Sequence, residues 1–287
     1  MDEQKRDEIL ERIANALERM APREKKIDNL DGSEGFIYEA KTGLIRPINI
    51  INRISLGLLQ GIVPQKKILY DNTINFSNDL PANNALLWGA RGTGKSSLVK
   101  SVHEEVILNT KSKYLKLVEI HREDISDLPE LLSLLSKYKK YKFILLCDDL
   151  SFDAGENTYK SLKAALDGGI EGKPNNVIFY ATSNRRHLMP RDMMENERST
   201  AINPSESVEE KVSLSDRFGL WIGFHNISQD TYLDIVDAYV KKFNIPINKK
   251  NLRAEALEWS ITRGARSGRV AWQFVQDIAG KSKTKIF

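Results

Sequence analysis

The sequence has only one cysteine, Cys147, among its 287 residues. A single thiol excludes an intrachain disulfide and any zinc site built from several cysteines. Long apolar runs are also missing: the stretch 48–59 is interrupted by Asn52, Arg53 and Gly57, so no segment is expected to span a membrane. The first ten residues are highly charged and lack the apolar segment of a secretory signal. We therefore expect a protein of the reducing cytoplasm.

The chain has little excess of either charge. It contains 43 Lys and Arg residues against 39 Asp and Glu residues, which gives a formal net charge of +4. So small an excess permits an anionic partner without requiring one. If the protein acts on a macromolecule, these totals favour a protein over nucleic acid.

Apolar runs alternate with helical patterns from residue 84 onward. Short strands are expected at 85–90, 114–120, 142–149, 176–184 and 220–224, with helices between them. Such alternation predicts an α/β fold with a parallel sheet flanked by helices. After residue 227 the period stays helical, so 227–287 is expected to be a small all-α unit.

The remaining segments complete the expected domain organisation. Apolar residues within 1–20 repeat at helical spacing, and we assign 1–50 to an N-terminal helical extension. The α/β domain then covers 51–226. Residues 190–211 are polar and aperiodic, and they are expected to form a loop.

A glycine-rich stretch, GARGTGKSS, joins the first of these strands to the following helix. It matches the phosphate-binding pattern G-x-x-x-x-G-K-[ST], and the strand–helix setting is the context that this pattern requires. Glycines let main-chain N–H groups approach phosphate oxygens, and the helix N-terminus favours the same anion. Lys95 would contact the β- and γ-phosphates, and Ser96 would ligate Mg²⁺. The expected nucleotide-binding residues here are Gly89, Ala90, Arg91, Gly92, Thr93, Gly94, Lys95, Ser96 and Ser97.

The apolar run at 142–149 ends in two carboxylates. In P-loop enzymes a strand-end aspartate holds Mg²⁺, and Asp148 fits that role. Asp149 is placed to orient or deprotonate an attacking water. ATP and Mg²⁺ are therefore the expected ligands, although two acids after a strand are also a common way to begin a helix.

These segments together resemble the AAA+ ATPases. GARGTGKSS is similar to their Walker A motif and FILLCDD to their Walker B motif. The combination of LLWGARGTGKSSL, DDLSF, ATSNRRHL and LSDRFGL resembles a bacterial AAA+ branch catalogued as a domain of unknown function. The resemblance covers residues 55–280 and implies an AAA+ nucleotide-binding domain followed by an α-helical lid.

The resemblance also implies roles for residues outside the P-loop. Asn184 corresponds to sensor 1, and Arg217 to an arginine finger that completes the site of a neighbouring subunit, which implies a homo-oligomer. Arg269, or alternatively Arg266, corresponds to the sensor 2 arginine. The segment around Gly61 and Ile62 corresponds to the part that touches adenine.

Plainer interpretations of the same residues remain open. Asn184 could cap a turn, Arg217 could form an ordinary salt bridge, and both lid arginines could face solvent. The four tryptophans are expected to pack in the core or the lid rather than to stack on a base.

One departure from the family pattern bears on the rate. The family usually has Asp-Glu at the end of Walker B, whereas this chain has Asp148 and Asp149. A carboxylate displaced by about 1 Å can slow catalysis by about a hundredfold. We therefore expect either an ATPase that remodels or switches a macromolecular partner, with a low rate, or a nucleotide-gated binding module with little turnover. A small-molecule P-loop kinase is a third, less favoured reading.

Overall fold

The computed structural model describes residues 6, 9–13, 27, 29–152, 158–168, 172–186, 188 and 214–286. Residues 9–13 are helical, in agreement with the predicted N-terminal helix. The rest of that helix, apart from residue 6, and the predicted loop at 190–211 lie outside the described residues.

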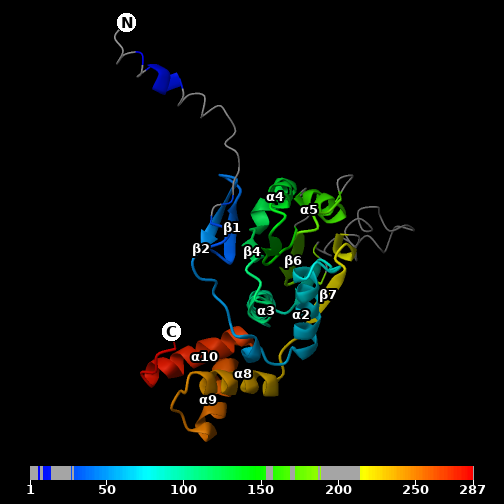
Figure 1. Cartoon of the computed structure of the whole chain (residues 1–287). Helices are drawn as coiled ribbons and strands as arrows, with labels where there is room; N and C mark the ends of the chain where they lie inside the picture. The colour runs from blue at the N-terminus through cyan, green and yellow to red at the C-terminus, as the bar shows by residue number, and fades with distance from the viewer. Residues whose placement is uncertain are drawn as a thin grey trace, which may run out of the picture.

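A seven-stranded sheet forms the centre of the described chain, in the order β2-β1-β4-β5-β6-β3-β7 (Figure 1). Neighbouring strands run parallel, except that β2 is antiparallel to β1. The predicted α/β fold class is thereby confirmed, and the five predicted strands correspond to β3–β7. The strands are β1 (Gly35–Glu39), β2 (Leu44–Ile48), β3 (Ala85–Gly89), β4 (Leu115–Glu119), β5 (Lys142–Cys147), β6 (Val177–Ser183) and β7 (Leu220–Phe224).

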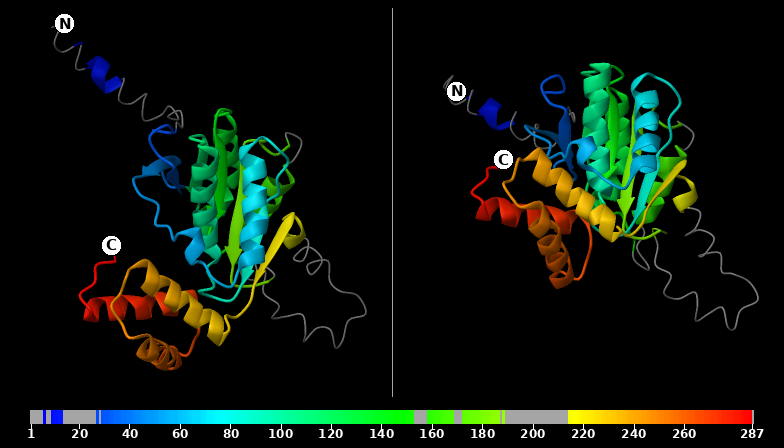
Figure 2. Two further views of the ribbon diagram at one scale, coloured as in Figure 1. Left: turned by 60° about the horizontal axis from the view of Figure 1, so that its bottom comes forward. Right: turned by 90° about the horizontal axis from the view of Figure 1, so that it is seen from below.

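Helices cover both faces of this sheet, which explains why its central strands are apolar throughout. In β5, Phe143 and Leu145 belong to one buried cluster, whereas Ile144 and Leu146 belong to the other. The first cluster lies under α4 (Leu128–Ser136) and α5 (Thr158–Asp167), and the second under α2 (Val63–Ser77) and α3 (Lys95–Thr110). Figure 2 shows α2 and α3 side by side on their face.

Three helices after residue 227 have a hydrophobic core of their own. Two of them begin at serine caps: Ser228 accepts a hydrogen bond from the Thr231 amide, and Ser267 from the Val270 amide. This unit lies beyond one end of the sheet (Figures 1 and 2). We keep 227–287 as the proposed lid and 51–226 as the proposed nucleotide-binding domain. The lid helices are α8 (Gln229–Lys242), α9 (Lys249–Thr262) and α10 (Gly268–Lys281).

The hairpin formed by β1 and β2 corrects the prediction of a helical extension over 1–50. Residues 35–48 add two strands to the sheet beside β4. Phe36 and Tyr38 alternate with less buried positions and pack into the main core, and Gly43 turns the chain with a φ of 63°. Each strand is only five residues long, so the period-2 pattern was too short to stand out.

Two short 3₁₀ helices are also present: η1 (Leu56–Leu58) precedes α2, and η2 (Arg122–Asp127) precedes α4. Across the described residues, every helix is too short or too polar to cross a membrane.

His103 is a buried titratable group at the centre of α3. Arg53 Nη2 lies 3.1 Å from its Nδ1, and Leu115 O lies 3.3 Å from its Nε2. Because guanidinium can only donate, Nδ1 accepts and the neutral ring donates from Nε2. Burial, aided by the charge of Arg53, lowers the pKa of His103 to about 3.

We predict that His103 makes the fold sensitive to mild acid. Its folded pKa lies below the ordinary value, so the unfolded chain binds the proton first and stability falls as the pH drops below about 6.5. At pH 5.5 this contribution is about 1 kcal/mol relative to pH 7.5. Urea unfolding of the wild type and of His103→Gln at both pH values measures it. The variant should lose less stability than the wild type, whereas exposed His121→Gln should match it; equal losses in all three would contradict the prediction.

Candidate functional site

The glycine-rich stretch GARGTGKSS, called the P-loop from here on, joins the carboxyl end of β3 to the first turn of α3. Glycine is required at its bends. Gly89 has a φ of 134°, and a Cβ there would lie 1.9 Å from the Phe224 carbonyl oxygen. Gly92 and Gly94 also have positive φ, at 72° and 93°. These bends leave the N-terminus of α3 without a side-chain cap, so its amides face the loop.

Lys95, the first residue of α3, turns back into this loop. Its Nζ donates to Gly89 O at 2.9 Å, to Ala90 O at 2.8 Å and to Asn184 Oδ1 at 3.1 Å. The residue is 6% exposed, and burial lowers its pKa from the ordinary value. The ammonium group thus lies between the P-loop and the end of β6.

The carboxylates after β5 form a connected network with neighbouring hydroxyl and amide groups. Asp148 Oδ1 accepts hydrogen bonds from Ser96 Oγ and Thr182 Oγ1. Asp149 Oδ1 accepts from Asn184 Nδ2, and the Asp149 amide donates to Thr182 Oγ1 at 3.0 Å. The structure therefore brings together residues that are far apart in sequence but follow adjacent parallel strands.

Asp149 adopts a left-handed backbone conformation with a φ of 54°. Aspartate and asparagine tolerate this region better than longer side chains do. The turn directs the carboxylate of Asp149 onto Asn184, whose Nδ2 donates to it.

The oxygen atoms around Ser96 and Asp148 are suited to Mg²⁺. A hydroxyl and a carboxylate are hard donors, and they already touch each other at the mouth of the P-loop. Among the described residues, no group of three or more His, Cys, Asp or Glu side chains could hold a metal ion. Mg²⁺ bound here would have to take further ligands from water and phosphate, as it commonly does.

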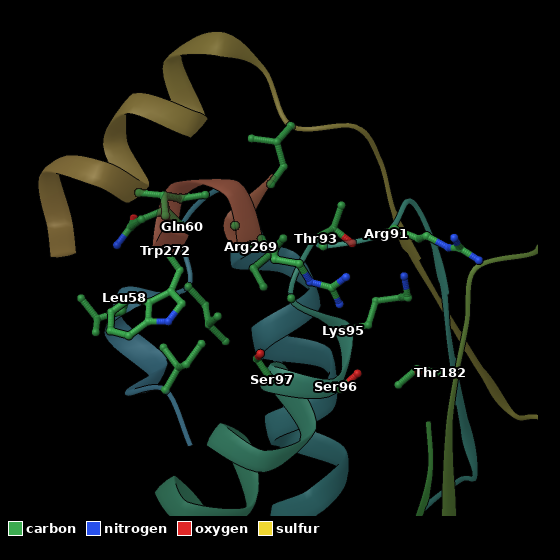
Figure 3. Close-up of a pocket in the computed structure, with 18 of the residues that line it drawn as sticks. Leu58, Gln60, Arg91, Thr93, Lys95, Ser96, Ser97, Thr182, Arg269 and Trp272 are labelled. Atoms are coloured by element: carbon green, nitrogen blue, oxygen red, sulfur yellow. The ribbon is translucent and has the colours of Figure 1, made fainter. Parts of the chain in front are cut away.

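A cavity of about 520 Å³ connects this polar region with an apolar one. Figure 3 shows Lys95, Ser96 and Thr182 on one side and Leu58 and Trp272 on the other. The apolar part is lined by Ile54, Leu58, Leu59, Ile62, Ile227, Ile235, Tyr239 and Trp272. Such a shape suits a ligand with a phosphate chain at one end and a flat base at the other.

The lid contributes directly to this cavity. Arg269 lines it and points toward Lys95 (Figure 3), whereas Arg266 lines only a neighbouring cavity. The Gly268 amide donates to Gly92 O at 2.8 Å, so the start of α10 is bonded to the P-loop. Of the two arginines considered from sequence, the geometry favours Arg269.

The other predicted residues differ in how they relate to the cavity. Gly61 lies between Gln60 and Ile62, which do line it, and its φ of 74° turns the chain toward α2 against Thr231. Gly89 does not line the cavity, and Ala90 lines only the neighbouring one. Arg91 lines the cavity, but its side chain extends away from Lys95 (Figure 3).

Arg217 does not lie at this site. It precedes β7 at the amino end of the parallel strands, whereas the P-loop follows the carboxyl end of β3. Its Nε donates to both carboxylate oxygens of Asp167, at 2.7 and 2.9 Å. The salt bridge considered from sequence is therefore present, and Arg217 cannot act on this chain's own cavity from this position.

Sequence reasoning missed several residues that line the cavity, and three of them bear on its chemistry. Thr182 is the last residue but one of β6, beside the carboxylates, and this polar end of an apolar strand was a usable signal. Gln60 lies inside the segment compared with the adenine-contacting region. Trp272 was assigned to packing; it does pack in the lid core, but it also lines the cavity, and the helical pattern of α10 cannot separate these two roles.

Comparisons with known proteins agree with this architecture. A family model described as "Protein of unknown function (DUF815)" matches residues 32–282. AMPPCP-bound DnaA from Aquifex aeolicus is 16% identical with a TM-score of 0.50, over 85% of this chain and 66% of that chain. No curated protein matches the chain.

Two further structures were matched. The FIGL-1 AAA domain in complex with ADP is 17% identical with a TM-score of 0.49, over 81% of this chain and 75% of that chain. The Thermotoga maritima RuvB Holliday junction branch migration motor is 12% identical with a TM-score of 0.44, over 78% and 71%. At these identities the likeness concerns the fold, which is that of the AAA+ P-loop proteins.

Proposed function

The chain belongs to the DUF815 family, and we propose that it is an AAA+ ATPase that hydrolyses ATP with Mg²⁺ to remodel or switch a macromolecular partner. One observation carries the proposal: a single cavity gathers Lys95, Ser96, Asp148, Asn184 and Arg269 beside an apolar wall. Each of these groups is the type that triphosphate chemistry needs at its position. The buried Cys147 fits a reducing compartment, so the cytoplasm is the proposed location.

Nucleotide binding would replace the oxygen atoms that Lys95 Nζ now contacts with phosphate oxygens. Lys95 Nζ is now held by two P-loop carbonyls and Asn184. Phosphate oxygens would give the ammonium group stronger, charge-assisted hydrogen bonds, while the loop amides and the N-terminus of α3 meet the same anion. The apolar wall with Trp272 would hold the base, and Gln60 would offer amide hydrogen bonds to its edge.

Hydrolysis would depend on the pair of Asp149 and Asn184. Their direct hydrogen bond supports this role, because it brings together a carboxylate and an amide that would both bind an attacking water. Ser96 and Asp148 would hold Mg²⁺, which neutralises charge on the phosphates when bound. Arg269 would add a second cation from the lid.

The second candidate is a nucleotide-gated binding module with little turnover. The hydrogen bond from Gly268 to Gly92 O favours it, because a bound phosphate chain would change the loop to which the lid is bonded. A nucleotide could thus move the lid whether or not it is hydrolysed.

The position of Arg217 supports action in an assembly. Arg217 lies at the amino end of the parallel strands, opposite the cavity, and is paired with Asp167. From there it could act only on the cavity of a second copy of the chain. We propose a homo-oligomer in which Arg217 completes the neighbouring site.

We predict that Lys95→Ala weakens ATP binding on the order of a hundredfold, because a charge-assisted hydrogen bond is worth about 1.5–3 kcal/mol. Titration with a fluorescent ATP analogue measures this loss. Lys67→Ala, on the exposed surface of α2, removes the same charge and should bind normally. Normal binding by Lys95→Ala would sink the proposed function.

We predict that Asp149→Glu slows phosphate release by about 10- to 100-fold while analogue binding stays close to normal. The longer side chain must strain the left-handed backbone or displace Asn184, and misplacement of about 1 Å has a cost of this size. Steady-state phosphate release tests it. Faster phosphate release by the glutamate variant would contradict the prediction, because it would mean that aspartate is too short to position the attacking water well.

We predict that Arg217→Ala retains analogue binding but loses about a thousandfold or more of the turnover, as expected for an arginine finger. The matched control is Arg46→Ala, which removes an exposed arginine paired with Glu39. Mixing Arg217→Ala with Lys95→Ala should restore part of the turnover, because each variant supplies what the other lacks. An inactive mixture, or equal loss of binding and turnover, would indicate a structural role for the ion pair with Asp167.

A further inference from the structure

Two lysine-rich segments lie side by side at the amino end of the sheet, away from the nucleotide cavity. They are KSKYLK at 111–116 and SKYKKYK at 136–142, and neither contains an acidic residue. The pairing of β4 with β5 places Leu115 opposite Lys142, and the Lys142 amide donates to Tyr114 O at 2.9 Å. We call the residues of these two segments the basic edge.

The basic edge presents its charges to solvent together with an aromatic ring. Tyr114 is 45% exposed. Lys140 Nζ lies 4.9 Å from the centre of the Tyr114 ring, and Tyr141 packs against that ring edge-on at 6.0 Å. The exposed lysines of the basic edge are Lys111, Lys113, Lys137, Lys139 and Lys140.

Few carboxylates offset these charges. Among the described residues, Asp31 lies 3.7 Å from Lys140 and accepts a hydrogen bond from Tyr141, while Asp79 pairs with Lys142. Of the seven lysines, only Lys140 and Lys142 form an ion pair with a described carboxylate, so five have none, whereas the net charge of the whole chain is only +4. The small net charge of the chain therefore conceals a strongly basic surface.

The buried Lys116 adds to the positive charge of the basic edge. Lys116 is 2% exposed, its Nζ donates to Ser33 O at 2.7 Å, and it lies 5.6 Å from the centre of the Tyr141 ring. Asp31 and Glu34 attract this amine, but neither forms an ion pair with it, so its charge is only partly offset.

We propose that the basic edge binds single-stranded nucleic acid. Lysines act as point charges that attract phosphates without reading sequence, and an exposed tyrosine gives an unpaired base a surface to stack on. A duplex would leave Tyr114 without a base to stack on. The numbers of basic and acidic residues in the sequence favoured a protein partner. The clustering of the lysines at the basic edge favours nucleic acid instead.

The location separates this function from the nucleotide site. The cavity lies where the parallel strands end, next to the lid, and the basic edge lies where β4 and β5 begin. Variants of the basic edge should therefore bind ATP analogue normally, which provides a check on folding that is independent of nucleic acid.

Fluorescence anisotropy with a labelled 20-nucleotide oligo-dT, over a salt series, tests the proposal. The triple variant Lys111→Gln, Lys113→Gln, Lys139→Gln should lose at least tenfold in affinity. Its salt slope should fall by about 2, since each single-strand phosphate contact contributes about 0.7. The matched control Lys241→Gln, Lys242→Gln, Lys283→Gln removes three exposed lysines from the lid or the turn that follows it, and should stay within twofold of the wild type.

A second variant, Tyr114→Leu, tests stacking. It should lose about 5- to 100-fold in affinity, the range of one base–aromatic contact, with an unchanged salt slope. The proposal is overturned if oligo-dT fails to bind at low salt or if both lysine triples lose equally. It is also overturned if Tyr114→Leu has no effect and a duplex of the same length binds as tightly, or if only phosphatidylserine vesicles are bound.

Discussion

The ammonium group of Lys95 holds the candidate nucleotide site together. Its three oxygen partners come from the end of β3, the P-loop and the end of β6, so one side chain ties together segments that are far apart in sequence. A buried cation needs such partners, because an isolated charge away from water is costly. The same requirement makes the site receptive to phosphate, whose oxygens can replace neutral carbonyls with stronger acceptors.

The polar ends of adjacent strands extend this arrangement. β5 delivers Asp148 and Asp149, and β6 delivers Thr182 and Asn184, to the same edge of the sheet. Parallel strands force this convergence, since all their carboxyl ends point one way. Basic residues lie at the opposite end of the strands. Arg217 is paired there with Asp167, and the lysines that precede β4 and β5 lie at the same end of the sheet. The fold thus separates the proposed nucleotide chemistry from the surfaces proposed to meet other macromolecules.

Much of the fold could be read from the sequence because its strands are buried on both faces. The apolar runs of β3–β7 and the 3.6-residue period of the lid helices are strong signals, and the P-loop pattern specifies the strand and helix around it. The hairpin of β1 and β2 was missed because its burial depends on pairing with the distant β4, which no local pattern reports.

The site was predictable where chemistry restricts the residue type, and less so elsewhere. Lys95, Ser96, Asp148, Asn184 and Arg269 meet in one cavity as expected. Trp272 was not expected there, because it packs against the lid core as well as lining the cavity, and the sequence pattern cannot separate these two roles. The left-handed turn at Asp149 depends on the meeting of two strands, so the one-methylene shortening could not be interpreted from sequence alone.

The most direct test of the account is the structure of the protein bound to a non-hydrolysable ATP analogue and Mg²⁺. The account predicts phosphate oxygens against the amides of 90–96, Lys95 Nζ moved from the Gly89 and Ala90 carbonyls to the β- and γ-phosphates, and the base against Trp272. An empty cavity, or an analogue bound elsewhere while Lys95 keeps its present partners, would contradict it.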